Sequence, residues 1–199
     1  MHIGTDKTGT TAIQHLLFNN KDYLGDLGWL YPNSGGTKSH QGIKESFGKE
    51  SDNNLAWEEM KKEIKEFNGS DIIMSHEGLY RLKPKNILSL KEELLSLNKG
   101  EVKIILYLRR QDALLESGLL QRIKQGRNIP KIDMDSDIEY REHLNYKKLH
   151  GNWCKVFGEQ SVLLRPYGKK FFKGDNSLYK DFFFSAMGLD FDLLEGLKT

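Results

Sequence analysis

The chain has little cysteine, no long apolar run and no segment typical of a secretory signal. Its single cysteine, Cys154, cannot form a disulfide within the chain and is compatible with a reducing compartment. No apolar stretch approaches the roughly 18 residues that a membrane-spanning helix needs, and no signal peptide precedes the first glycine-rich motif. These absences predict a cytoplasmic protein without a membrane span.

An excess of charge of one sign is also missing. The 30 lysine and arginine residues nearly balance the 28 aspartate and glutamate residues, which leaves a formal net charge of +2. Bulk charge therefore does not indicate binding to nucleic acid or to a membrane surface, and any anion site must be local. The chain of 199 residues is long enough for one domain with a real core, since domains usually hold about 100–200 residues.

The apolar pattern predicts strands that alternate with helices. Buried strands are expected at residues 1–3, 71–75, 102–108 and 161–167, and helices at 10–20, 57–67, 84–97, 149–157 and 178–187. This alternation implies an α/β fold of three layers, with a central parallel sheet and ligands at the carboxyl ends of its strands. The first strand has few residues before its glycine turn, whereas strands usually run about 5–6 residues. We therefore expect a single domain over residues 1–199 that is trimmed at one or both ends.

The most informative motif is the glycine-rich turn at residues 3–11, IGTDKTGTT, between the first strand and the first helix. Backbone N–H groups of such a turn, with the positive end of the following helix, bind an anion, and Lys7 adds a point charge inside the loop. In the common nucleotide-triphosphate loop, G-x-x-x-x-G-K-[ST], a lysine follows the second glycine. Gly4 and Gly9 have that spacing here, but Thr10 stands where that lysine would be. The arrangement suits a phosphosulfate, and Thr10 or Thr11 is also expected to cap the helix.

A second motif follows the third predicted strand. The apolar run VKIILYL ends in Arg109 and Arg110, and Ser117 comes eight residues after Arg109 in a helix-like segment. An arginine at the carboxyl end of a parallel strand can bind a phosphate bidentately. The structural alternative for Arg109 is a surface ion pair with Asp112.

Together the two motifs resemble those of sulfotransferases that use 3′-phosphoadenosine-5′-phosphosulfate (PAPS), in particular the bacterial carbohydrate type. In that family a P-loop-like turn binds the 5′-phosphosulfate, and an arginine with a serine eight residues later holds the 3′-phosphate. The similarity in layout covers residues 2 to about 188. The resemblance implies that the PAPS-binding residues are Lys7, Thr8, Gly9, Thr10, Thr11, Arg109 and Ser117. Arg110 is less favoured, because its spacing to Ser117 is seven.

Sulfuryl transfer needs an anchored donor, a stabilised leaving oxygen and a base for the acceptor proton. Lys7 is the candidate to stabilise the leaving oxygen. Positioning and electrostatics dominate such in-line transfers as they do in phosphoryl transfer, but the sulfuryl group carries less charge, so no metal is expected. The base should come from Ser75-His76-Glu77, where the second predicted strand ends. An imidazole accepts a proton near neutrality whereas a carboxylate needs burial to do so, which favours His76.

The resemblance favours Glu77 instead, because bacterial members of the family carry a Ser-x-Glu ending at this strand. Both residues therefore stay candidates for the base. Their structural alternatives are a helix cap for Glu77 and a hydrogen-bonded, half-buried position for His76. His40, in the preceding loop, is expected to be polar surface.

The resemblance also implies the substrates. The donor PAPS would leave as 3′,5′-adenosine bisphosphate, and the acceptor would be a hydroxyl or amine of a small molecule, carbohydrate or glycolipid. Many family members close the donor site with a basic, glycine-containing loop, but nothing after Phe191 is similar to it. Two other classes fit parts of the sequence: a P-loop small-molecule kinase that uses ATP and Mg²⁺, which Glu77 could serve, and a nucleotide-binding module without catalysis.

Overall fold

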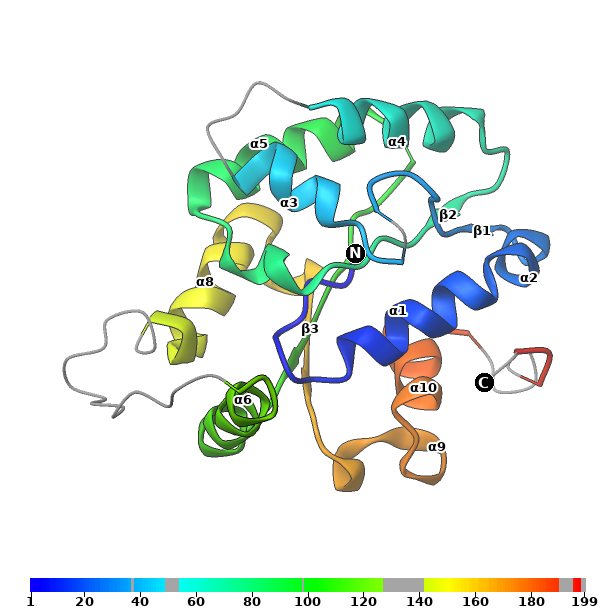
Figure 1. Cartoon of the computed structure of the whole chain (residues 1–199). Coiled ribbons are helices and arrows are strands. Elements are labelled where there is room, and N and C mark those ends of the chain that lie inside the picture. The colour runs from blue at the N-terminus through cyan, green and yellow to red at the C-terminus, as the bar shows by residue number, and fades with distance from the viewer. Residues whose placement is uncertain (37, 49–53, 98, 127–141, 190–194, 198–199) are drawn as a thin grey trace.

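The protein is a mixed α/β protein whose described strands pair in parallel (Figure 1). The computed structural model describes residues 1–36, 38–48, 54–97, 99–126, 142–189 and 195–197. Strand β1 (Trp29–Leu30) pairs with β2 (Asp71–Ile72), and β3 (Ile104–Leu108) pairs with β4 (Val162–Pro166). The predicted mixture of helices and parallel strands is confirmed, although the regular strands are shorter than the apolar runs that indicated them.

The N-terminal segment connects the two strand pairs. His2 forms parallel bridges to Ser75 on one side and to Ile105 on the other. Further along, the Thr5 N–H donates to the carbonyl oxygen of Tyr107 at 2.9 Å. Five parallel segments therefore lie side by side, in the order 29–30, 71–75, 1–5, 104–108 and 162–166.

Alternate residues of β3 enter two separate apolar cores. Ile104 and Leu106 belong to the first core, and Ile105 and Tyr107 belong to the second. The first core is closed by α3 (Gln41–Gly48), α4 (Leu55–Glu66), α5 (Pro84–Ser96) and α8 (Tyr146–Phe157). The second is closed by α1 (Thr10–Asn19), α2 (Lys21–Asp26) and the π-helical η4 (Phe182–Met187). Helices thus cover the parallel segments from both faces, as the period-two alternation of a strand requires.

The structure describes six further helical elements. They are η1 (Glu77–Arg81), α6 (Gln111–Lys124), η2 (Glu159–Ser161), η3 (Lys169–Phe171), α9 (Lys173–Asn176) and α10 (Leu178–Asp181). The helix predicted at 178–187 is divided between α10 and η4. Within the described ranges, no helix combines the length and the apolar character that crossing a bilayer demands.

Candidate functional site

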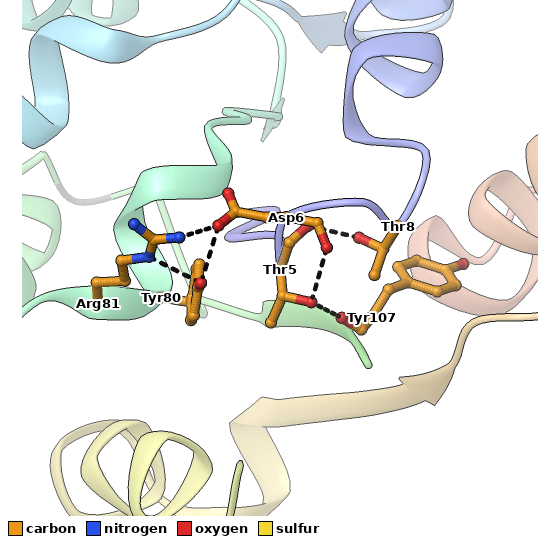
Figure 2. A network of polar contacts seen from close by, with 6 residues as sticks. All are labelled: Thr5, Asp6, Thr8, Tyr80, Arg81 and Tyr107. Atoms are coloured by element: carbon orange, nitrogen blue, oxygen red, sulfur yellow. Dashed lines mark hydrogen bonds and ion pairs between the residues drawn. The ribbon is translucent and has the colours of Figure 1, made fainter. Parts of the chain in front are cut away.

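The glycine-rich turn leaves the N-terminal segment and passes directly into α1. Two buried threonines fix its shape (Figure 2). The Thr5 hydroxyl donates to the carbonyl oxygen of Tyr107 at 3.1 Å, and the Thr8 hydroxyl donates to the carbonyl oxygen of Thr5 at 2.6 Å. Because the Thr8 hydroxyl is used inside the turn, this residue can serve an anion through its backbone N–H.

The turn places two residues in the left-handed region of backbone conformation. Lys7 and Gly9 have φ angles of 59° and 72°, and turns that contain such residues can direct successive N–H groups towards an anion. Gly9 is the N-cap of α1, and no side chain caps the helix. The prediction that Thr10 or Thr11 caps it is therefore wrong: Thr10 is buried and Thr11 is exposed. The first N–H groups of α1 have no partner within the helix and remain suited to an anion.

Both glycines of the turn lie close to other segments, and packing leaves no room for a side chain at Gly4, where the neighbour is backbone. A Cβ at Gly4 would lie 2.9 Å from the backbone of Glu77, and one at Gly9 would overlap Cδ2 of Leu178. Both residues also have positive φ angles, which side chains rarely adopt. The two glycines that predicted a phosphate loop are therefore the points where the turn packs against other segments: Gly4 against Glu77, and Gly9 against Leu178 of α10.

Arg109 follows β3 and lies against the turn. Its Nη1 donates to the carbonyl oxygen of Lys7 at 3.2 Å, and its guanidinium lies 5.8 Å from the ring centre of Tyr167. The ion pair with Asp112, considered for Arg109, is formed by Arg110 at 2.5 Å, and both of those side chains are well exposed. Among the described residues, no carboxylate forms an ion pair with Arg109. Its guanidinium is therefore positioned beside the turn without a charge partner there.

Ser117 is less closely connected to the turn. It lies half-buried in α6, and its neighbour Gly118 lines a cavity described below. No contact in the described parts of the chain joins Ser117 to Arg109. The structure thus brings Arg109 to Lys7, whereas the role of Ser117 stays a prediction.

The two candidate bases stand in different environments. His76 is the N-cap of η1, and its Nδ1 atom is buried without a hydrogen-bond partner among the described residues. Burial lowers the pKa of His76, partly opposed by the charge of Glu77. His76 is buried rather than half-buried, as the structural alternative had it, and the side-chain cap considered for Glu77 is wrong, since no side chain caps η1. Instead, Oε2 of Glu77 accepts a hydrogen bond from Nε2 of Gln14 at 2.8 Å.

A cavity of about 530 Å³ lies between the turn, η1 and α6, within the range of roughly 300–1,000 Å³ typical of ligand pockets. Lys7 and Glu77 both line it, together with Asp6, Tyr80 and Arg81. The opposite wall comes from α6 and from residues 143–144. Of the predicted catalytic residues, Lys7 and Glu77 share this cavity and His76 does not line it.

A polar network at the cavity connects the turn to η1 (Figure 2). The Tyr80 hydroxyl donates to Oδ2 of Asp6 at 3.1 Å and accepts from Nε of Arg81 at 2.7 Å, and Arg81 also forms an ion pair with Asp6. Sequence reasoning missed these three residues, because contacts across 74 or 75 positions leave no local pattern. It also missed Gln14, for which a signal existed: Gln14 is a polar residue on the otherwise apolar face of the first helix.

Buried histidines hold the segment that precedes Glu77. His40, expected at the polar surface, is 1% exposed, so that prediction is wrong. Its Nδ1 accepts from the N–H of Ser75 at 2.9 Å, and its Nε2 donates to the carbonyl oxygen of Pro32 at 3.0 Å. Burial lowers the pKa of His40 to about 4. The Ser75 hydroxyl is hydrogen-bonded to Nδ1 of His2 at 2.7 Å, which places Ser75 between two neutral rings.

The described part of the chain contains no group of three or more His, Cys, Asp or Glu side chains arranged to hold a metal ion. The expectation that catalysis needs no metal stays a prediction. The prediction that nothing after Phe191 is similar to the family's basic lid concerns a segment of which residues 191–194 and 198–199 lie outside the described residues.

Comparisons with known proteins identify no family for this chain. No family model matches it, and no solved structure matches it. A protein from Archaeoglobus fulgidus, described as an uncharacterized protein, is 34% identical over 119 residues. That alignment covers 60% of this chain and 30% of the relative, so the part of the chain that matches spans less than a third of that protein's length.

Proposed function

We propose that the protein is a PAPS-dependent sulfotransferase that transfers a sulfuryl group to a hydroxyl or amine of a carbohydrate, glycolipid or other small acceptor. The observation that carries this proposal is that Lys7, inside an anion-binding turn, and Glu77, a carboxylate, line the same cavity. Lys7 supplies a cation for the leaving group, and Glu77 supplies a base. We propose the cytoplasm as the place of the reaction and no nucleic acid as a partner.

The arrangement of the parallel segments supports a three-layer, P-loop-like architecture. The turn emerges from the central segment, between 71–75 and β3, and helices cover both faces. In open α/β sheets ligands bind at the carboxyl ends of the strands, where neighbouring connections leave to opposite sides. Lys7, Glu77 and Arg109 all follow the carboxyl ends of adjacent parallel segments.

The donor would be held at both of its charged ends. The N–H groups of residues 7–11 and the positive end of α1 suit the 5′-phosphosulfate. Arg109, which has no carboxylate partner among the described residues and lies beside Lys7, suits the 3′-phosphate, with Ser117 as the second ligand. The Arg109 side chain also supports the turn through the Lys7 carbonyl, so donor binding at the two ends would be coupled.

The reaction is an in-line displacement at sulfur. The acceptor oxygen or nitrogen forms a bond to sulfur while the bond from sulfur to the bridging phosphate oxygen breaks, and 3′,5′-adenosine bisphosphate leaves. The Lys7 ammonium stabilises the charge that develops on that oxygen, and Glu77 takes the acceptor proton. Glu77 is preferred to His76 as the base because it lines the cavity with Lys7.

Two other classes remain as alternatives. A small-molecule kinase would place ATP in the turn and use Glu77 towards Mg²⁺, but Thr10 occupies the lysine position of that loop, and β3 is followed by arginines rather than by a metal-binding carboxylate. A nucleotide-binding module without catalysis would use the turn and Arg109 but would not need Glu77 in the cavity.

An acceptor screen with ³⁵S-labelled PAPS tests the proposal. The wild-type protein should label at least one class of hydroxyl or amine acceptor. Glu77→Gln should lower the rate by roughly 10²–10⁴-fold, as loss of a general base does, whereas His76→Asn should retain most of it. If no acceptor takes up the sulfur label but an acceptor takes up the γ-phosphate of ATP, the proposed sulfotransferase activity is wrong and the kinase alternative is supported.

A further inference from the structure

Gln14 contacts the proposed base from the helix that begins at the anion-binding turn. It is the fifth residue of α1 and is 5% exposed, between Ile13 and the apolar pair Leu16 and Leu17. Its Nε2 donates to Oε2 of Glu77 at 2.8 Å, across 63 positions of the chain. A buried amide on the apolar face of a helix is costly unless it is hydrogen-bonded, and this contact satisfies its donor.

The contact has a defined direction. An ionised carboxylate can only accept hydrogen bonds, so the amide nitrogen must face Glu77. In the described part of the chain, Oε2 is engaged by Gln14, and no hydrogen bond engages Oε1. One carboxylate oxygen is therefore held in place by the Gln14 amide, and the Glu77 side of this contact belongs to the lining of the cavity.

The same helix carries the donor site at its first turn. Residues 7–11 form the proposed phosphosulfate site, and Gln14 follows within the next turn of α1. The backbone of Glu77 also packs closely against the glycine-rich turn, since a Cβ atom at Gly4 would lie only 2.9 Å from it. The distance between donor sulfur and base is thus determined by a short, rigid path through α1 rather than by the long connection between residues 14 and 77.

We propose that Gln14 is a positioning residue for sulfuryl transfer: its amide holds and orients the Glu77 carboxylate that accepts the proton. This inference rests on the proposed function. It adds a residue that does not contact donor or acceptor and that acts only through Glu77.

Kinetics of Gln14→Met test the inference, because methionine is similar in size and lacks the donor. We expect kcat to fall by roughly 10- to 100-fold, the loss seen when a partner that orients a metal-ligating side chain is removed. Affinity for 3′,5′-adenosine bisphosphate should be unchanged. The acidic limb of the pH–rate profile should move to higher pH, because a hydrogen bond to the charged form of a carboxylate favours that form.

Two further variants keep the test decisive. Gln14→Glu preserves the shape of the side chain but places a second carboxylate against Glu77, and it should move the acidic limb further than Gln14→Met, because like charges disfavour ionisation. His15→Met, on the exposed face of the same helix, is the matched control and should leave the profile unchanged. In a Glu77→Gln background, Gln14→Met should have no further effect on kcat, since the two residues act as a unit.

The outcomes separate the two claims. If the wild-type protein neither binds 3′,5′-adenosine bisphosphate nor transfers label, the proposed function fails, and the role of Gln14 fails with it. If the wild-type protein does both but Gln14→Met keeps the wild-type acidic limb, or lowers kcat equally in the Glu77→Gln background, then Gln14 has only a structural role and this inference alone is overturned.

Discussion

Arg109 donates a hydrogen bond to the backbone carbonyl of Lys7, 102 positions away in the chain. The contact joins the end of β3 to the backbone of the glycine-rich turn, which carries Lys7, the other cation proposed to bind PAPS. Arg109 differs in this from its neighbour Arg110, whose side chain forms an ion pair with Asp112 at the surface.

The two adjacent arginines should therefore differ in their effect on donor binding. Arg109→Ala should weaken binding of 3′,5′-adenosine bisphosphate by roughly 10- to 100-fold, because hydrogen bonds to charged groups contribute about 1.5–3 kcal/mol. Arg110→Ala, the matched control, removes an exposed ion pair that is worth little and should leave the affinity unchanged. Isothermal titration calorimetry measures both, and equal affinities for the two variants would remove Arg109 from the donor site.

The second glycine of the turn should be intolerant of a side chain. Gly9→Ala puts a side chain on a residue whose φ angle of 72° alanine disfavours, and its Cβ would also displace the tip of Leu178, so we expect it to destabilise the protein by roughly 1–2 kcal/mol. Gly25→Ala is the control: it lies inside α2, where nothing is within 4 Å of the added atom, and it should be neutral or stabilising by about 0.5–1 kcal/mol. Urea unfolding of both variants measures the difference, and similar stabilities would contradict the packing described for the turn.

Stability should fall as the pH is lowered, because His40 is buried in its neutral form. Its pKa is about 4 in the folded protein, whereas an unperturbed histidine titrates at 6.5, so between these values the unfolded chain binds more protons. Stability contributed by His40 is therefore present above pH 6.5 and is lost as the pH falls towards 4, at up to ~1.4 kcal/mol per pH unit.

Urea unfolding between pH 7 and pH 5 checks this dependence. The charge of Glu63 raises the pKa of His40, and that of His76 lowers it. The variant to compare is His40→Gln, because its amide can keep both hydrogen bonds and does not titrate. Its stability should depend less steeply on pH than that of the wild-type protein. His15→Gln, at an exposed position of α1, should show the same dependence of stability on pH as the wild-type protein. If His40→Gln also shows that dependence, the burial of a neutral His40 ring is contradicted.

The sequence was most informative where the physical cause is local. Gly4 and Gly9 indicated the turn because positive φ angles and close packing require glycine at both positions. The apolar spacing of Trp57, Met60 and Ile64 predicted the buried face of α4, since a helix brings such positions to one side. The run before Arg109 similarly predicted β3 as a buried strand.

Contacts between distant segments could not be derived in this way. The pairing of Asp6 with Arg81 depends on how η1 lies beside the turn, and no local spacing encodes that approach. The burial of His40 depends on Ser75, 35 positions later. The ion pair of Asp112 with Arg110 was also not predicted, because residues one position apart leave a strand end in different directions.

Calorimetric titration with 3′,5′-adenosine bisphosphate, compared with ATP and Mg²⁺, tests the central claim most directly. The account predicts that the wild-type protein binds the bisphosphate more tightly, because the glycine-rich turn and Arg109 match its two phosphates. It further predicts that Arg109→Ala removes this preference. Tighter binding of ATP with Mg²⁺, or a preference that survives Arg109→Ala, would contradict the assignment of this site to PAPS.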